Sequence, residues 1–235
     1  MTVHTFHLAE VPAAVGARAL LRVPPPGSVP GLDHAECLSL MRLGAPTLSP
    51  DRLQLRRLAV FAQWRDVDAL DRYLEQDPLG RALARGWHVR MQFLRRWSTL
   101  AALPGLPVRA GQWDQDEPVV AVTLARMRLG RVPRFLRWGK PVERLVRDHP
   151  GTTLALAAFR PPRTISTFSV WRTVREMEEM VRGRSDVRDP ARHAAAMAER
   201  ERRDFHHEFA TYRFRPLSEH GAWEGRTRIV PEGGA

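Results

Sequence analysis

Two stretches of the chain repeat the same order of apolar and polar positions. Residues 58–65 and 166–172 are short apolar runs that each end in a Trp-Arg pair. Each run is followed by apolar residues spaced three or four positions apart, over 67–74 and 174–181. A short apolar run is typical of a buried strand, and the wider spacing is that of an amphipathic helix. The pattern therefore predicts a strand followed by a helix in each of two repeats.

The repeat extends on both sides of this unit. An Asp-Pro pair, at 77–78 and at 189–190, predicts a further helix start in each copy, since proline is favoured at the first helical position. The first helix of the second copy fits 132–149, whereas in the first copy residues 24–31 (PPPGSVPG) predict a short or irregular helix. The remaining apolar runs predict strands at 6–11, 31–44, 87–97, 118–129, 151–162 and 205–217.

Read in order, each half is β-α-β-β-α-β, which is the ferredoxin-like α+β pattern. Such a sheet carries helices on one face and leaves the other face apolar. Two of these sheets can bury their open faces against each other, so the sequence predicts tandem ferredoxin-like repeats (βαββαβ twice) that form an intramolecular dimeric α/β barrel. We expect an N-terminal half at 1–113, a C-terminal half at 114–227 and a flexible tail at 228–235.

Composition limits the class of protein. An apolar fraction of 43% is that of a folded chain. The sequence has no uncharged apolar stretch of about 18 residues and no signal-like N-terminus, so we expect a cytoplasmic protein. Cys37 is the single cysteine, which excludes an internal disulfide and a multi-cysteine metal site, and we expect it in the core.

The net charge is +11, and 36 of the 37 basic residues are arginines. This charge attracts acidic partners. The arginines are scattered, with no helix-turn-helix, zinc-finger or RNP pattern, so we expect no specific nucleic-acid binding and regard peripheral contact with an anionic membrane as the more favoured interaction. The sequence also lacks G-x-S-x-G, G-x-G-x-x-G and G-x-x-x-x-G-K-[ST], which argues against serine hydrolase chemistry and a built-in nucleotide site.

A family resemblance rests on four motifs of the second half. They are Thr167-Phe168-Ser169-x-Trp171, His193 with Ala196 three positions on, Arg213-Phe214, and Gly221-x-Trp223-x-x-Gly225. With these motifs the second half resembles the spheroidene monooxygenase family of carotenoid biosynthesis. The chain departs from the family pattern at 158–162 (AFRPP), where a Gly/Glu-rich stretch is usual, and at Phe205-His206, where a Trp-Phe pair is usual.

The resemblance implies haem chemistry centred on His193. Members of the family and of the wider dimeric α/β-barrel group include haem-binding enzymes, and some wider relatives hold haem through a histidine on a helix of the C-terminal half. One protein nitrogen suffices, because the porphyrin supplies the other four ligands. Arg81 occupies the equivalent position of the first repeat, so the iron ligand would belong to one half alone. The alternative is a helix-start histidine that contacts solvent or a carboxylate.

The other candidate site residues surround this histidine in the expected fold. Phe168, Trp171 and Met197 would line an apolar cofactor pocket, although such residues are also common in an ordinary core. Arg213 would pair with a haem propionate or a substrate carboxylate. His206 and His207 are neighbours on a strand, so at most one of them faces the pocket. The remaining histidines show no paired arrangement in the sequence: His4, His7, His34, His88, His149 and His220.

The sequence thus leads to one hypothesis and two alternatives. The hypothesis is a monooxygenase-type oxidoreductase that binds haem b and a small or lipophilic substrate, with a separate ferredoxin or reductase as electron donor. The first alternative is a cofactor-free monooxygenase of the same fold, and the second is a non-catalytic haem or ligand carrier. Fused halves remove the need for a dimer without forbidding an oligomer.

Overall fold

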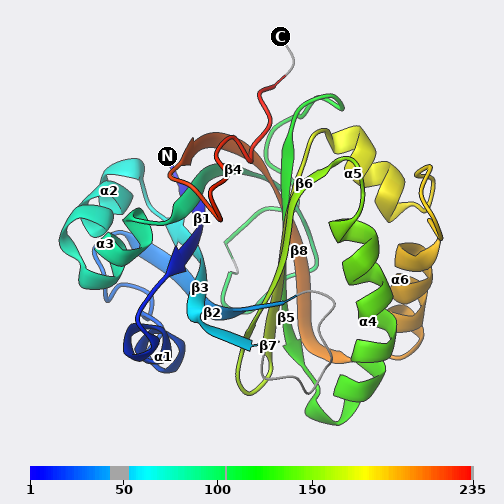
Figure 1. The fold of residues 1–235 in the computed structure, drawn as a ribbon, viewed down its shortest axis with the longest axis horizontal. Coiled ribbons are helices and arrows are strands. Elements are labelled where there is room, and N and C mark those ends of the chain that lie inside the picture. The colour runs from blue at the N-terminus through cyan, green and yellow to red at the C-terminus, as the bar shows by residue number, and fades with distance from the viewer. Residues whose placement is uncertain (43–52, 104, 234–235) are drawn as a thin grey trace.

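In the computed structural model, the described residues (1–42, 53–103 and 105–233) place eight strands in a closed barrel between two groups of helices (Figure 1). The elements of the first half are β1 (Val3–Glu10), α1 (Ala13–Leu21), β2 (Leu32–Met41), β3 (Leu53–Trp64), α2 (Val67–Gln76), α3 (Pro78–Ala84) and β4 (Trp87–Trp97). Those of the second half are β5 (Val119–Met127), α4 (Val132–Arg147), β6 (Thr152–Arg160), β7 (Thr164–Trp171), α5 (Val174–Val181), α6 (Arg192–Arg202) and β8 (His206–His220), with a 3-10 turn, η2 (Leu129–Arg131), before α4.

The strand order confirms the predicted fold. Around the barrel the strands run β1-β3-β2-β6-β7-β5-β8-β4, so each half has the ferredoxin-like order β4-β1-β3-β2 or β8-β5-β7-β6. Neighbouring strands are antiparallel, and β2–β6 and β4–β8 are the two seams that join the halves. The predicted limits at 113 and 227 stay predictions, because the seams merge both halves into one sheet.

Strand alternation divides the buried side chains into layers. Alternate residues point into the barrel, where large rings such as Phe6, Phe61, Trp87 and Phe214 form one core cluster. The opposite faces pack against α1, α2 and α3 in the first half and against α4 and α5 in the second. Strands buried on both faces read as continuous apolar runs, which is why the sequence showed them clearly.

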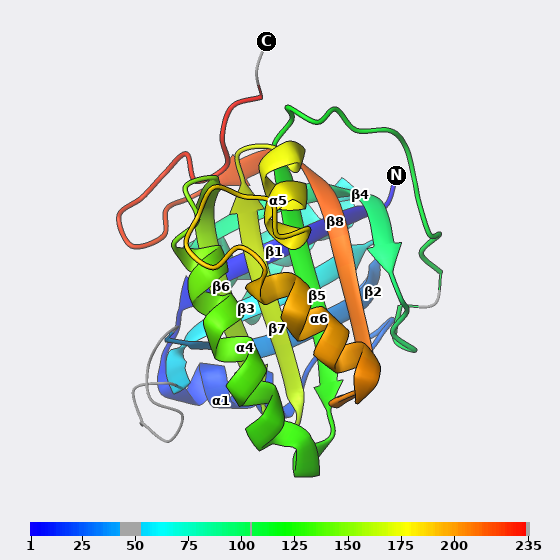
Figure 2. The same cartoon turned by 90° about the vertical axis from the view of Figure 1, so that its right-hand side faces the viewer.

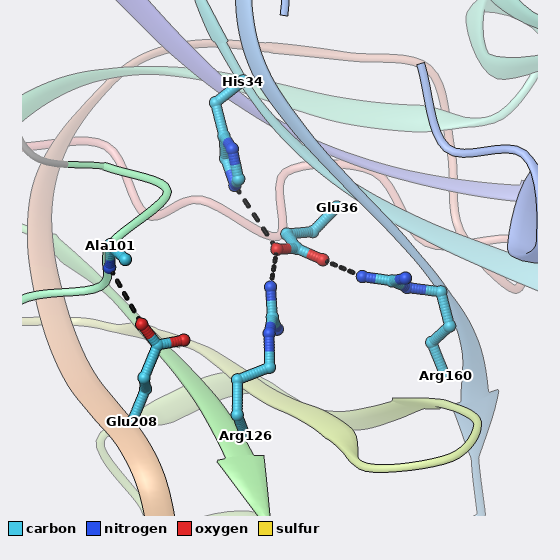
Figure 3. A network of polar contacts seen from close by, with 6 residues as sticks. All are labelled: His34, Glu36, Ala101, Arg126, Arg160 and Glu208. Carbon is cyan, nitrogen blue, oxygen red and sulfur yellow. Dashed lines mark hydrogen bonds and ion pairs between the residues drawn. The ribbon is translucent and has the colours of Figure 1, made fainter. Parts of the chain in front are cut away.

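A buried ion-pair network crosses the β2–β6 seam (Figure 3). The carboxylate of Glu36 on β2 accepts hydrogen bonds from Arg126 on β5 and from Arg160 on β6, the latter at 2.6 Å. His34 Nε2 lies 3.5 Å from the same carboxylate. The Glu36 side chain is only 2% exposed, so the network joins the two halves of the chain inside the protein. Nearby, Glu208 accepts a hydrogen bond from the backbone N–H of Ala101 at 3.1 Å.

Three details differ from the sequence predictions. The first helix, α1, is regular and ends at Leu21, so residues 24–31 follow it rather than interrupt it. In the second half α6 begins at Arg192, two residues beyond the predicted proline start, because Asp189 takes a left-handed conformation (φ 58°) and does not cap the helix. In the predicted tail, Ile229 is buried, and Glu219 accepts its backbone N–H at 2.9 Å. Residues 43–44 of one predicted strand and 234–235 of the tail lie outside the described residues.

Candidate functional site: a cavity between α4, α5, α6 and the sheet

A cavity of about 750 Å³ lies between the C-terminal half of the sheet and helices α4, α5 and α6, which cover the strands in Figure 2. Its apolar lining includes Phe135, Trp138, Trp171, Met177, Met180 and Met197. Its polar lining includes Thr123, Thr167, Thr211, His193, His206 and Arg213. A volume of this size and a mainly apolar lining with a few polar groups are typical of small-molecule and cofactor sites.

Short side chains on the strands create the space. Ala121 and Ala125 of β5, Ala155 of β6 and Thr167 of β7 all border the cavity. The hydroxyl groups of Thr123 on β5 and Thr211 on β8 lie 3.2 Å apart and satisfy each other. The side of the cavity that the sheet forms therefore consists of small side chains and of hydroxyl groups that are hydrogen-bonded to each other.

His193 borders this cavity from the first turn of α6. Its Nδ1 lies 3.2 Å from the carbonyl oxygen of Val181 at the end of α5. A carbonyl oxygen only accepts, so Nδ1 carries the proton and Nε2 keeps a lone pair. Burial lowers the pKa of His193, which favours the neutral ring. A neutral imidazole with its Nδ1–H bound to a backbone carbonyl is the usual state of a metal-ligating histidine.

His206 also borders the cavity, at the sheet side. A bulge between β5 and β8 at Arg126/Met127 breaks the alternation, so His206 packs on the ring of Phe209 at a centroid distance of 5.0 Å. Its Nδ1 lies 3.1 Å from the carboxylate of Asp204, while its buried Nε2 has no hydrogen-bond partner among the described residues. His207, its neighbour, is exposed, so one of these two histidines faces the cavity.

Arg213 already has a partner within the chain. Its Nη1 donates to the Glu178 carboxylate at 2.9 Å, and its guanidinium stacks on Trp97 at 4.2 Å. The side chain is 8% exposed, and burial lowers its pKa although Glu178 opposes this effect. Arg182 binds the same carboxylate at 2.8 Å. Two arginines on one carboxylate leave an excess of positive charge beside the cavity, which suits an anionic group of a ligand.

The other predicted pocket residues lie at the cavity in different ways. Trp171 and Met197 border it, and Trp171 Nε1 donates to the Ser169 hydroxyl at 2.9 Å. Phe168 borders it as well, but its ring stacks on that of Phe6 in the barrel interior, with 3.8 Å between the ring centroids. The reason is the two-residue period of β7, which sends Phe168 to the face opposite that of Trp171 and Ser169.

Five of the six histidines that show no pairing in the sequence have a histidine, carboxylate or hydroxyl partner in the fold, so that prediction is wrong for these five, whereas His4 packs among phenylalanine rings. His7, His88 and His220 stack across β1, β4 and β8, with centroid distances of 4.8 and 4.6 Å, and burial lowers the pKa of each ring. His34 contacts Glu36, and His149 Nε2 lies 3.0 Å from the Ser185 hydroxyl. Cross-strand register brings these groups together, and one sequence shows no register.

The donor set limits which cofactor the cavity fits. Within 1–42, 53–103 and 105–233, no group of three or more His, Cys, Asp or Glu side chains is arranged to hold a metal ion. A single histidine with a lone pair on Nε2 fits a metal that brings its own equatorial ligands, as in a porphyrin. The apolar walls and the arginines also fit the flat ring and the carboxylates of such a group. Over the same residues, no helix is long and apolar enough to cross a membrane.

Comparisons with known proteins support the fold. No family profile matches the sequence, and no curated protein matches it. An aldoxime dehydratase solved in complex with butyraldoxime has a TM-score of 0.59 over 97% of this chain and 85% of its own, at 9% identity. A protein of Fusobacterium nucleatum described as a monooxygenase matches over 94% of both chains (TM-score 0.40, 8% identity), and a haem-degrading enzyme of Listeria monocytogenes over 89% and 98% (TM-score 0.29, 8% identity). At these identities the similarity concerns the fold alone.

Proposed function

We propose that this chain is a spheroidene-monooxygenase-like, haem-dependent oxidoreductase that acts on a small or lipophilic organic molecule. The observation that carries the proposal is His193, which borders the 750 Å³ cavity with Nδ1 held by the Val181 carbonyl and with a lone pair on Nε2. The resemblance of the second half to that oxygenase family supports the same residue. The solved aldoxime dehydratase, which shares the fold, binds a small organic molecule, and this supports the size of the substrate.

The residues of the chain would hold haem b and exclude water. His193 would bind the iron through Nε2, and the backbone carbonyl of Val181 would fix the tautomer and orientation of the imidazole. Met197, one helical turn further along α6, and Trp171 on β7 would supply apolar packing for the haem. Arg213, stabilised by Glu178, would face a propionate. When bound, haem would supply the one-electron and oxygen chemistry that these side chains lack.

Electrons would come from a separate protein. The sequence has no dinucleotide or P-loop motif, so a ferredoxin or a reductase is the proposed donor. The net charge of +11 favours an acidic donor and also favours peripheral contact with an anionic membrane. The proposal includes a cytoplasmic location and permits an oligomer.

An absorbance spectrum tests the cofactor. Protein expressed with a haem supply, or titrated with hemin, is expected to show a Soret band that shifts on reduction and with CO. His193→Ala is expected to lose the iron–imidazole spectrum, whereas His207→Ala, an exposed histidine nearby in the sequence, should keep it. A His193→Gly variant that regains the spectrum on addition of imidazole would exclude a purely structural role.

Other results would refute the ligand assignment or favour one of the two alternative functions. A wild-type spectrum in His193→Ala would refute the ligand assignment. A colourless protein that does not bind hemin would favour the cofactor-free monooxygenase. Haem binding without substrate turnover, with reductant and oxygen present, would favour the carrier.

A further inference from the structure

Asp204 and His206 form an oriented pair at the sheet side of the cavity. The carboxylate of Asp204 accepts the backbone N–H of His206 at 2.9 Å and lies 3.1 Å from the ring Nδ1. A carboxylate only accepts hydrogen bonds, so Nδ1 must donate and the neutral ring keeps its lone pair on Nε2. Asp204 thus fixes both the tautomer and the plane of the ring.

The Nε2 atom of His206 is buried but has no hydrogen-bond partner among the described residues. The residue is 3% exposed, and nothing in the described part of the chain forms a hydrogen bond with this nitrogen. A buried acceptor without a donor is costly and calls for an explanation, and His206 differs from the other histidines with an unpartnered nitrogen because it borders the cavity. The ring borders the cavity, and its other neighbours are the rings of Phe135, Phe205 and Phe209.

The charged groups around the His206 ring leave Nε2 free to accept a hydrogen bond. Arg200 of α6 stacks on Phe209 at 4.2 Å, and Arg128 at the end of β5 donates to the backbone carbonyl of His206 at 2.8 Å. Arg128 donates to a backbone carbonyl, and the buried Nε of Arg200 has no hydrogen-bond partner among the described residues, so neither arginine occupies Nε2. Burial lowers the pKa of His206, and the nearby Asp204 only partly opposes this effect.

We propose that His206, oriented by Asp204, is the acid–base residue of this cavity, and that the substrate is an apolar molecule with one hydroxyl-type donor that binds Nε2. In the reaction that this geometry permits, the substrate O–H bond breaks, its electron pair stays on oxygen and a new N–H bond forms at Nε2. The Asp204 carboxylate then stabilises the imidazolium, and Nε2 gives the proton back to an oxygen of the product, which regenerates the neutral ring. This inference rests on the cavity of the proposed function as the substrate site, but not on haem.

Two probe molecules that differ in a single donor test the assignment. The probes are 4-propylphenol, which carries a hydroxyl, and 4-propylanisole, in which a methyl ether replaces it. Binding of each to the full-length protein, as purified and after hemin loading, is measured by calorimetry or by ligand-observed NMR. The wild-type protein should bind the phenol about 3- to 10-fold more tightly, the range expected for one neutral hydrogen bond.

Variants separate this role from packing. His206→Phe keeps an aromatic ring in the aromatic surroundings, and it should bind both probes equally. Asp204→Asn should reduce the preference for the phenol, because an amide can donate to Nδ1 and so favour the other tautomer. His207→Phe is the matched control on the exposed side of the same strand and should keep the wild-type preference.

Three results would overturn the inference. One is equal binding of both probes, or of neither, by the wild-type protein. Another is an unchanged preference for the phenol in His206→Phe. The third is loss of the iron–imidazole spectrum in His206→Phe with retention in His193→Ala, which would make His206 the metal ligand. Since the probe preference is measured also without haem, the inference can fail while the proposed cofactor is confirmed, and the reverse.

Discussion

Replacing Glu36 by glutamine should weaken the contact between the two halves of the barrel. The substitution keeps the size of the side chain and removes its charge. Arg126 and Arg160, whose side chains are 16% and 24% exposed, would then lose their shared carboxylate inside the protein. Breaking a buried ion pair by removing one partner typically costs about 3–5 kcal/mol. Because both arginines keep some contact with water, we expect a loss of about 2–4 kcal/mol in the free energy of unfolding at pH 7.

The lowered pKa of the carboxyl leads to a similar magnitude. Burial by itself raises the pKa of Glu36, but the contacts with His34 and Arg126 outweigh it and lower the pKa from 4.5 to about 2. At about 1.4 kcal/mol for each pH unit, this difference corresponds to about 3 kcal/mol of stability. The folded-state pKa lies below the unfolded one, so this contribution is complete above about pH 5 and is lost as the pH falls toward 2.

Urea unfolding of wild type and Glu36→Gln between pH 7 and pH 3 measures this effect. The difference between the two proteins cancels the titration of other groups, so it should shrink steadily below pH 5. Glu10→Gln is the matched control, because Glu10 also pairs with an arginine, Arg57, but is 67% exposed. That control should cost less than about 1 kcal/mol. A Glu36→Gln protein as stable as wild type at pH 7, or a difference independent of pH, would refute the reasoning.

Four further experiments test other parts of the structure. Burial among phenylalanine rings lowers the pKa of His4 to about 4, so stability should fall as the pH drops from about 6.5 to 4, and His4→Phe should remove that part of the urea-unfolding profile. Burial raises the pKa of Cys37 to about 12, so a thiol reagent should label it only in denaturant, and labelling of the native protein would contradict its place in the core. Asp77→Ala removes a side chain that accepts two backbone N–H groups of α3, and it should cost about 1 kcal/mol in urea unfolding. Ala196→Trp should fill the cavity and weaken hemin and phenol binding at least 10-fold. Ala194→Trp, on the exposed side of α6, is the control and should leave binding unchanged. Equal binding by the two variants would show that these ligands bind outside the cavity.

The sequence predicted the elements that local patterns encode. Apolar runs located every strand, and the repeated Trp-Arg and Asp-Pro pairs revealed the two halves. The barrel arrangement of the strands could also be predicted, because two ferredoxin-like sheets with open apolar faces bury these faces by packing against each other. His193 and its pocket neighbours came from the resemblance to a family rather than from a pattern, since one histidine on a short helix has no signature of its own.

The contacts that sequence reasoning missed depend on register and on irregular backbone. The stack of His7, His88 and His220 joins three strands far apart in the chain, and only the barrel aligns them. His206 faces the helices because of a bulge, which shifts it from the face that simple alternation assigns. The Asp204–His206 spacing was visible in the sequence, but its meaning depends on the burial of Nε2.

The cavity itself follows from a difference between two otherwise similar halves. In the first half Asp77 alone separates α2 from α3, and α3 packs closely enough that Gly80, Ala82 and Leu83 are buried. In the second half residues 182–191 separate α5 from α6, and every residue of α6, all within the described ranges, keeps some exposure. The longer connection thus allows α6 to stand off from the short side chains of the sheet. Because of this difference His193 borders a cavity, whereas Arg81, its counterpart in the first half, donates a hydrogen bond to the carbonyl of Gln76 at 2.8 Å. The two similar halves together form the barrel, and the cavity forms where the second half departs from the first.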